Sequence, residues 1–126
     1  MLANVEKASL LKNDERGSTH VFSARESGYF IVLNRKKGTV SGNHYHKGAM
    51  KSKSPEIFYL VSGRAELTIR DMKTKEEEVI DIEEGMKVEI PANVYHAVKA
   101  RTDIILMEFI TSKEDFQKYE SDTVKL

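Results

Sequence analysis

The stretch RAELTIR, residues 64–70, alternates polar and apolar side chains with a period of two. Successive side chains of a β-strand point to opposite faces, so the apolar residues of this stretch share one face. The stretch MKVEI, residues 86–90, repeats the pattern. Both stretches therefore predict half-buried strands whose apolar side chains line a common interior. The predicted interior residues are Ala65, Leu67, Ile69, Val88 and Ile90.

Short apolar segments continue on both sides of this stretch, and turn-forming residues such as Ser62-Gly63 and the run from Glu83 to Gly85 separate them. Many short strands with regularly spaced turns are typical of a β-sandwich or a closed barrel. We therefore predict an all-β fold, a small antiparallel β-barrel or jelly roll. The further predicted strands are Tyr29 to Asn34, Glu56 to Ser62, Glu78 to Ile82, Tyr95 to Ala100 and Asp103 to Ile110.

One short helix is predicted near the C-terminus. Ser112, followed three residues later by Asp115, resembles a capping box at a helix start. Nothing in the sequence marks a linker or an internal repeat, so residues 1–126 are predicted to form a single domain.

Composition excludes several classes of function. Twenty basic and twenty acidic residues give a net charge of zero, so no global field attracts nucleic acid or an anionic membrane. The chain has no cysteine, which excludes disulfides, thiolate metal sites and cysteine nucleophiles. No apolar run approaches the roughly 18 residues of a membrane span. We expect a cytoplasmic protein.

Three of the four histidines lie where metal ligands are expected. His44 and His46 are two residues apart, so on a strand they project to the same face with Cα atoms about 6.6 Å apart. Two imidazoles at this spacing can share one metal ion. Glu56 opens an otherwise apolar run, and a buried carboxylate needs a cation beside it. His96 follows a turn that contains Pro91 and Asn93.

These residues resemble the two motifs of the cupins. Gly42, His44, His46, Glu56 and Gly63 follow the order of the first motif, and Gly85, Pro91 and His96 have the spacing of the second. The resemblance implies a cupin-type barrel, a double-stranded β-helix, in which His44, His46, Glu56 and His96 form a three-histidine, one-glutamate metal set. It also implies a homodimer.

The chain departs from the cupin pattern at three places. The glycine before the histidine pair is displaced, because only Asn43 separates Gly42 from His44 and Gly38 lies further back. Asn93 replaces a glycine of the second motif, and asparagine tolerates the left-handed conformation that such a turn needs. Nine residues separate His46 from Glu56, more than in the usual first motif. This segment carries Lys47, Lys51 and Lys53, which could hold a diphosphate or a carboxylate, although a solvated loop is the more ordinary interpretation.

Two short stretches are similar to enzymes of nucleotide-linked keto sugars. Residues 13–18, NDERGS, are similar to a D-x-R-G segment of the dTDP-4-dehydrorhamnose 3,5-epimerases and the sugar 3,4-ketoisomerases. Residues 42–46 with 58–63 resemble the metal-bearing cupin domain of a capsular-sugar reductase. The resemblance implies an epimerase or isomerase that acts on a nucleotide-linked keto sugar, so the expected partner is a small molecule. From the charge balance we expect neither nucleic acid nor membrane as a partner.

The expected cofactor is a divalent metal ion, Zn, Fe, Mn or Ni, and the ligand set does not choose among them. Epimerisation beside a ketone requires proton transfer, for which the candidate catalytic residues are Tyr59, Tyr95 and any site histidine that does not bind the metal. Two alternatives remain open. One is an Fe(II)-type dioxygenase of a small molecule, and the other is a non-catalytic, metal-containing module that binds a sugar or an anion.

Overall fold

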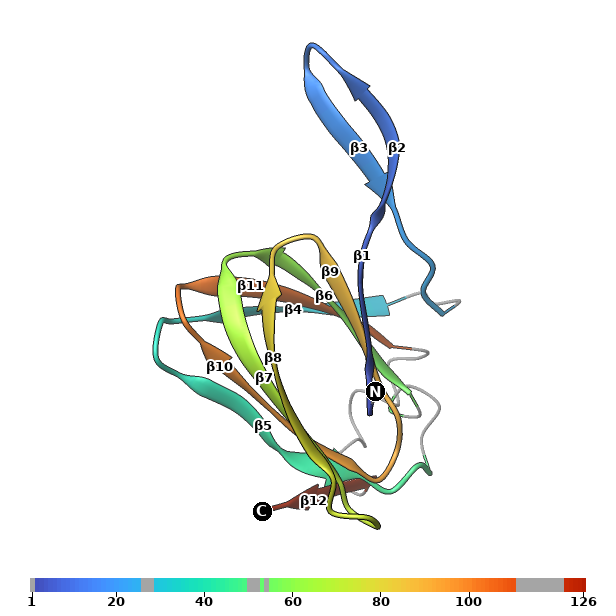
Figure 1. Cartoon of the computed structure of the whole chain (residues 1–126), viewed down its shortest axis with the longest axis vertical. Coiled ribbons are helices and arrows are strands. Elements are labelled where there is room, and N and C mark those ends of the chain that lie inside the picture. Colours follow the sequence, from blue (N-terminus) through green and yellow to red (C-terminus); the bar gives the residue numbers. More distant parts are fainter. Residues whose placement is uncertain (1, 26–28, 50–52, 54, 111–121) are drawn as a thin grey trace.

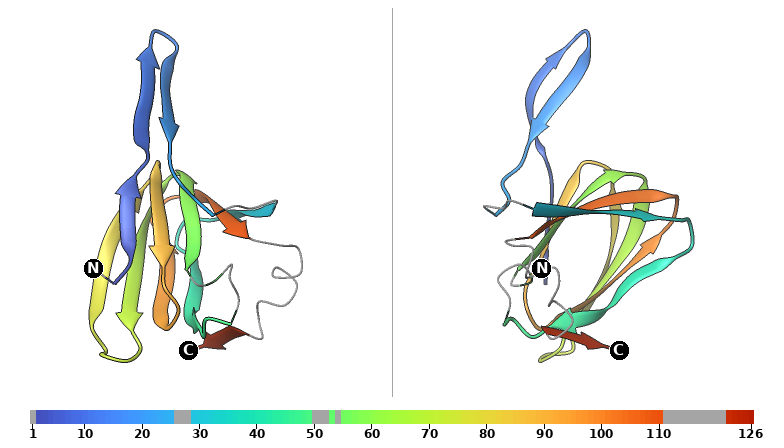
Figure 2. Two further views of the ribbon diagram at one scale, coloured as in Figure 1. Left: turned by 90° about the vertical axis from the view of Figure 1, so that its right-hand side faces the viewer. Right: turned by 180° about the vertical axis from the view of Figure 1, so that it is seen from behind.

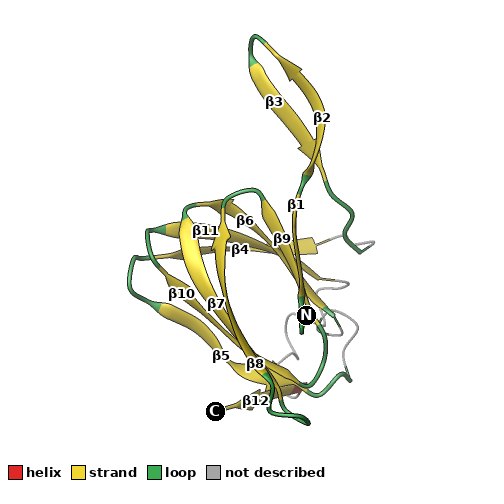
Figure 3. Ribbon diagram, viewed as in Figure 1, coloured by secondary structure: helices red, strands yellow, loops and turns green. Residues whose placement is uncertain are grey.

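The computed structural model of the chain describes residues 2–25, 29–49, 53, 55–110 and 122–126. Within these residues, two five-stranded antiparallel sheets enclose a common interior (Figures 1 and 3). This confirms the predicted all-β barrel. The predicted helix after Ser112 lies outside the described residues. In the part of the chain that is described, no helix is long and apolar enough to cross a membrane.

The first sheet has the strand order β1-β9-β6-β11-β4, and the second has the order β12-β5-β10-β7-β8. A separate two-stranded sheet pairs β2 with β3. The strands are β1 (Asn4–Lys7), β2 (Ser9–Asp14), β3 (Gly17–Val21), β4 (Tyr29–Arg35), β5 (Val40–His46), β6 (Glu56–Ser62), β7 (Arg64–Asp71), β8 (Glu77–Glu83), β9 (Met86–Ile90), β10 (Val94–Ala100), β11 (Ile104–Ile110) and β12 (Thr123–Lys125).

The predicted interior residues lie in the core between the two sheets. Ala65, Leu67 and Ile69 on β7, and Val88 and Ile90 on β9, are each at most 1% exposed. Full burial of a large aliphatic side chain stabilises a fold by about 1.5–3 kcal/mol. The alternation seen in these two strands therefore sets which face of each sheet turns inward.

All seven strands predicted from the sequence are present, and their ends differ from the prediction by no more than one residue. The predicted strands did not include β1, β2, β3, β5 or β12, although His44 and His46 of β5 were placed on a strand by their spacing. Every residue of β3 and nearly every residue of β2 is exposed, so neither strand carries the apolar alternation that marks a buried face.

The β2–β3 hairpin projects away from the barrel (Figures 1 and 2). Its tip holds the NDERGS stretch, where Arg16 forms an ion pair with Asp14 at 3.1 Å. The stretch that resembles sugar-modifying enzymes is therefore a hairpin turn at a distance from the interior of its own barrel.

Candidate metal centre and cavity

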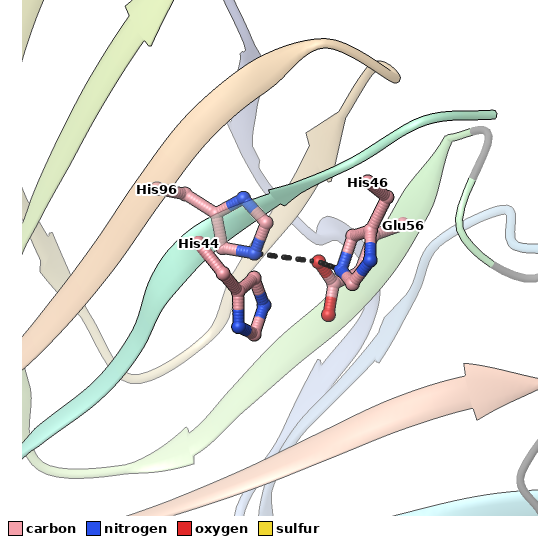
Figure 4. Close-up of side chains that lie close together, drawn as sticks. All are labelled: His44, His46, Glu56 and His96. Atoms are coloured by element: carbon pink, nitrogen blue, oxygen red, sulfur yellow. Dashed lines mark ion pairs between the residues drawn. The ribbon is translucent and has the colours of Figure 1, made fainter. Parts of the chain in front are cut away.

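Three strands from both sheets bring the predicted ligands together (Figure 4). His44 and His46 project from β5, and His96 comes from the neighbouring strand β10, directly across from His44 in the register. Glu56 is the first residue of β6 in the facing sheet. The potential ligand atoms of these four residues all lie within 4.8 Å of one another. We call these residues the four-residue cluster.

A local irregularity in the pairing of β5 with β10 orients the histidine side chains. The register between β5 and β10 shifts between His96 and Ala97, opposite Gly42. Gly42 has a φ of 88°, and a Cβ atom there would lie 2.9 Å from the His96 carbonyl oxygen. A glycine is therefore required where β5 approaches His96. Asn93, just before β10, has a φ of 62°, as expected for the residue that replaces the motif glycine.

Glu56 faces two of the histidines. Its Oε2 atom lies 2.9 Å from His96 Nε2 and 3.3 Å from His46 Nε2. Within the described residues, however, neither His46 Nε2 nor Glu56 Oε2 has a partner in hydrogen-bond geometry. Buried polar atoms that approach one another without a hydrogen bond fit ligation of a shared cation. By donor type and spacing, the cluster fits a divalent metal ion.

Contacts behind two of the rings orient them. His96 Nδ1 lies 3.2 Å from the Val94 carbonyl oxygen. A carbonyl oxygen can only accept a hydrogen bond, so in the neutral ring Nδ1 carries the proton. The lone pair of Nε2 then points toward Glu56. His46 Nδ1 lies 3.1 Å from the Thr123 hydroxyl of β12. Such outer contacts orient the histidines of metal sites.

Two further charged residues, Lys53 and Glu108, adjoin the cluster. Lys53 Nζ contacts Glu108 Oε2 and lies 3.4 Å from Glu56 Oε1. Burial disfavours the charged form of Lys53, but Glu56 and Glu108 outweigh burial and raise its pKa. Burial, followed by the charge of Glu56, raises the pKa of Glu108 to about 7. Burial acts against ionised Glu56 as well, but His96 and Lys53 hold the pKa of Glu56 well below its usual range.

The cluster opens onto a cavity of about 340 Å³ between the sheets, a volume within the range of small-molecule sites. His44, Glu56 and His96 form part of its wall. The other lining residues combine apolar side chains with a few charged ones. They include Ile31, Leu33, Arg35, Lys53, Phe58, Leu106 and Glu108.

The structure does not bring the two predicted tyrosines to the cavity. Tyr59 lies on the outer face of β6, where its ring stacks on Phe22 with a centroid distance of 4.5 Å. The Tyr95 hydroxyl donates a hydrogen bond to Asn43 Oδ1 at 2.6 Å, outside the barrel. Both residues differ by an odd number of positions from a ligand on the same strand, so they point to the opposite face. We therefore assign neither tyrosine to proton transfer.

Sequence reasoning missed Glu108 and misplaced Lys53. In β11 the buried positions alternate, and Glu108 continues the inward series of Ile104 and Leu106. That alternation was a signal for a charged residue inside the barrel. Lys53, interpreted above as part of a solvated loop, is only 6% exposed. No periodic pattern in its segment indicated this burial.

A family model described as the polysaccharide biosynthesis C-terminal domain matches residues 12–124. The chain belongs to this family. No curated protein matches the sequence.

Several solved structures resemble this member of the polysaccharide biosynthesis C-terminal domain family. A 3,4-ketoisomerase from Helicobacter canadensis is 16% identical, with a TM-score of 0.77 over 100% of this chain and 92% of that one. A single-site mutant of the 3,4-ketoisomerase QdtA from Thermoanaerobacterium thermosaccharolyticum, in complex with TDP-4-keto-6-deoxyglucose, is 13% identical, with a TM-score of 0.75 over 99% and 88%.

A third similar structure is the dTDP-4-dehydrorhamnose 3,5-epimerase from Sulfolobus tokodaii, which is 21% identical with a TM-score of 0.69 over 89% of this chain and 71% of that one. At these identities the likeness establishes the fold. It confirms the cupin-type barrel that the sequence predicts.

Alanine substitutions test the metal centre. His44→Ala and His96→Ala are each expected to weaken binding of Zn²⁺ by more than the roughly 10–100-fold that loss of an outer-shell partner costs. Because Glu56 is buried and contacts His96, Glu56→Ala is expected to cost as much as a histidine substitution. Elemental analysis and competition with a chromophoric chelator measure these losses. Wild-type protein that takes up no divalent metal at neutral pH contradicts the prediction.

Metal affinity is expected to fall as pH falls. Burial, reinforced by His96 and His46, lowers the pKa of His44 to about 4, so this ring is neutral at pH 7. Burial also disfavours charged His96, but Glu56 outweighs burial and raises the pKa of His96. A ligating imidazole must be neutral, so a metal must displace the His96 proton at and above the ordinary histidine pKa of about 6.5.

Calorimetry in two buffers of different ionisation enthalpy measures this proton release. Because the pKa of His96 is raised, we expect metal binding to release a proton from this ring around the ordinary histidine pKa, with release diminishing as pH rises further. Metal binding that releases no proton near neutrality is inconsistent with a charged His96 in the metal-free protein.

Proposed function

We propose that this protein is a metal-dependent epimerase or isomerase that acts on a nucleotide-linked keto sugar. The observation that carries the proposal is the convergence of three histidines and one glutamate within 4.8 Å at the wall of a cavity of small-molecule size. The ligands would be His44, His46, Glu56 and His96.

Three of the proposed ligands, His44, Glu56 and His96, line the cavity, so a substrate held there would lie beside the centre. A divalent metal polarises a carbonyl oxygen as a Lewis acid, the chemistry needed to acidify the carbon beside a ketone. The apolar side chains of Ile31, Leu33 and Phe58 line the cavity. Proton transfer requires a further group inside the cavity, and by its position we assign this role to Glu108.

The choice of substrate class rests on similarity. The chain belongs to a family named for polysaccharide biosynthesis, and one similar ketoisomerase binds TDP-4-keto-6-deoxyglucose. A thymidine-diphosphate keto sugar is therefore the first substrate to test. No feature of the cavity specifically favours the Fe(II)-type dioxygenase or the binding module. Both remain as outcomes of the test.

Exchange with solvent tests the activity. Metal-loaded protein in D₂O is expected to introduce deuterium into TDP-4-keto-6-deoxyglucose at a carbon next to the keto group, as followed by NMR. Glu108→Gln keeps the shape of the side chain but cannot act as a base, so we expect exchange to slow by about 10²–10⁴-fold. Glu89→Gln, on the outside of β9, is the matched control and is expected to exchange at the wild-type rate.

The other outcomes distinguish the alternatives. Binding of the sugar without exchange by metal-loaded protein indicates a binding module. Substrate-dependent oxygen uptake by the Fe²⁺-loaded protein indicates a dioxygenase.

We also propose that the protein is a homodimer. The β2–β3 hairpin pairs with no other strand of the described chain, and an isolated two-stranded hairpin is at best marginally stable in water. It exposes Leu10 and Leu11 at 59% and 67%. The outer face of the first sheet exposes Phe30 and Val32 at 59% and 51%. A second copy that covers both surfaces is the proposed partner.

Light scattering coupled to size-exclusion chromatography measures the mass in solution. The wild-type protein is expected to have the mass of two chains. Leu11→Glu places a charge in the proposed interface and is expected to yield monomers. Val79→Glu is the control, since Val79 is 59% exposed on β8 of the other sheet. A monomeric wild type contradicts the proposal.

A further inference from the structure

Three buried charged side chains lie beside the histidines and are joined by ion pairs. Lys53, Glu56 and Glu108 are each 6% exposed, and Lys53 Nζ reaches both carboxylates. Burial of a charge is costly unless the charge is paired, and here one ammonium group is shared by two carboxylates.

The two oxygens of Glu56 have different neighbours. Oε2 faces His46 and His96 at 3.3 and 2.9 Å, whereas Oε1 lies 3.4 Å from Lys53 Nζ. Lys53 therefore stands beside the same carboxylate that a metal at the cluster would use. A metal ion and an ammonium group that share one carboxylate repel each other.

We propose that Lys53 and Glu108 set the affinity of the four-residue cluster for divalent cations. Lys53 lowers the affinity because its charge adjoins the cluster and its Nζ holds one oxygen of Glu56. Glu108 partly restores the affinity because its carboxylate draws the ammonium group away from Glu56. This inference rests on the proposed metal centre.

The two side chains therefore have opposite effects. Lys53→Met removes the charge and keeps an unbranched side chain of similar length, which leaves two carboxylates beside the histidines. We expect Zn²⁺ to bind this variant at least about tenfold more tightly than wild type. Glu108→Gln removes the carboxylate that draws Lys53 away from Glu56, and we expect Zn²⁺ binding at least about tenfold weaker.

A second buried lysine supplies the control. Lys87 on β9 is 1% exposed and pairs with Glu6 and Glu89 at 3.0 and 3.1 Å, on the outside of the barrel. Lys87→Met also leaves two carboxylates without their lysine, but away from the histidines. Its Zn²⁺ affinity is expected to stay within about twofold of wild type.

The experiment measures Zn²⁺ dissociation constants by chelator competition for all four proteins, with thermal unfolding to verify that each is folded. The double variant Lys53→Met with His96→Ala tests whether the Zn²⁺ that Lys53→Met binds more tightly lies at the four-residue cluster. If it does, the loss of His96 must abolish the increase in Zn²⁺ affinity. Visible absorption of bound Co²⁺ provides a second check that histidines ligate the ion.

Each outcome decides the inference. If wild type binds Zn²⁺ and Lys53→Met binds it equally or more weakly, the inference fails while the metal centre stands. If neither protein binds, the metal centre fails and the inference fails with it. If Lys53→Met does not fold, the Glu108→Gln variant decides, because unchanged or tighter binding by it overturns the proposed role of the pair.

Discussion

A carboxylate buried inside the barrel is the constraint on which the site depends. An ionised carboxyl group without a partner is among the most costly groups to remove from water. Glu56 is nevertheless buried, and three nitrogen-bearing side chains surround its carboxylate: His46 and His96 face Oε2, and Lys53 lies beside Oε1. The strands that deliver these groups must therefore lie close together whenever the barrel is closed.

The barrel meets this requirement with ordinary strand geometry and one irregularity. Alternation places His44 and His46 on the inner face of β5, and antiparallel pairing places His96 across from His44. The shift of register next to Gly42 then changes the local direction of the strand. The sheet that carries the histidines faces the sheet that carries Glu56, so the cluster lies at the junction of the two layers.

Much of this arrangement could be predicted from the sequence, because a strand's two-residue period needs no knowledge of the partner strand. It identified the interior of β7 and β9, and it brought the two histidines of β5 to one face. The same rule would have removed Tyr59 and Tyr95 from the site, and in β11 it would have placed Glu108 inside. The sequence around Lys53 has no such alternation, so the burial of Lys53 is seen only in the folded structure. The exposed β2–β3 hairpin likewise has no buried face to leave a pattern in its sequence.

The division of the cluster between two sheets has a mechanical consequence. A cation held by all four side chains is a non-covalent cross-link from β5 and β10 to β6, in a chain that has no cysteine to form a covalent one. Separation of the layers at this seam then requires release of the ion. For a proposed centre that holds an ion, local opening of the barrel, and with it amide hydrogen exchange along these strands, would be coupled to its occupancy.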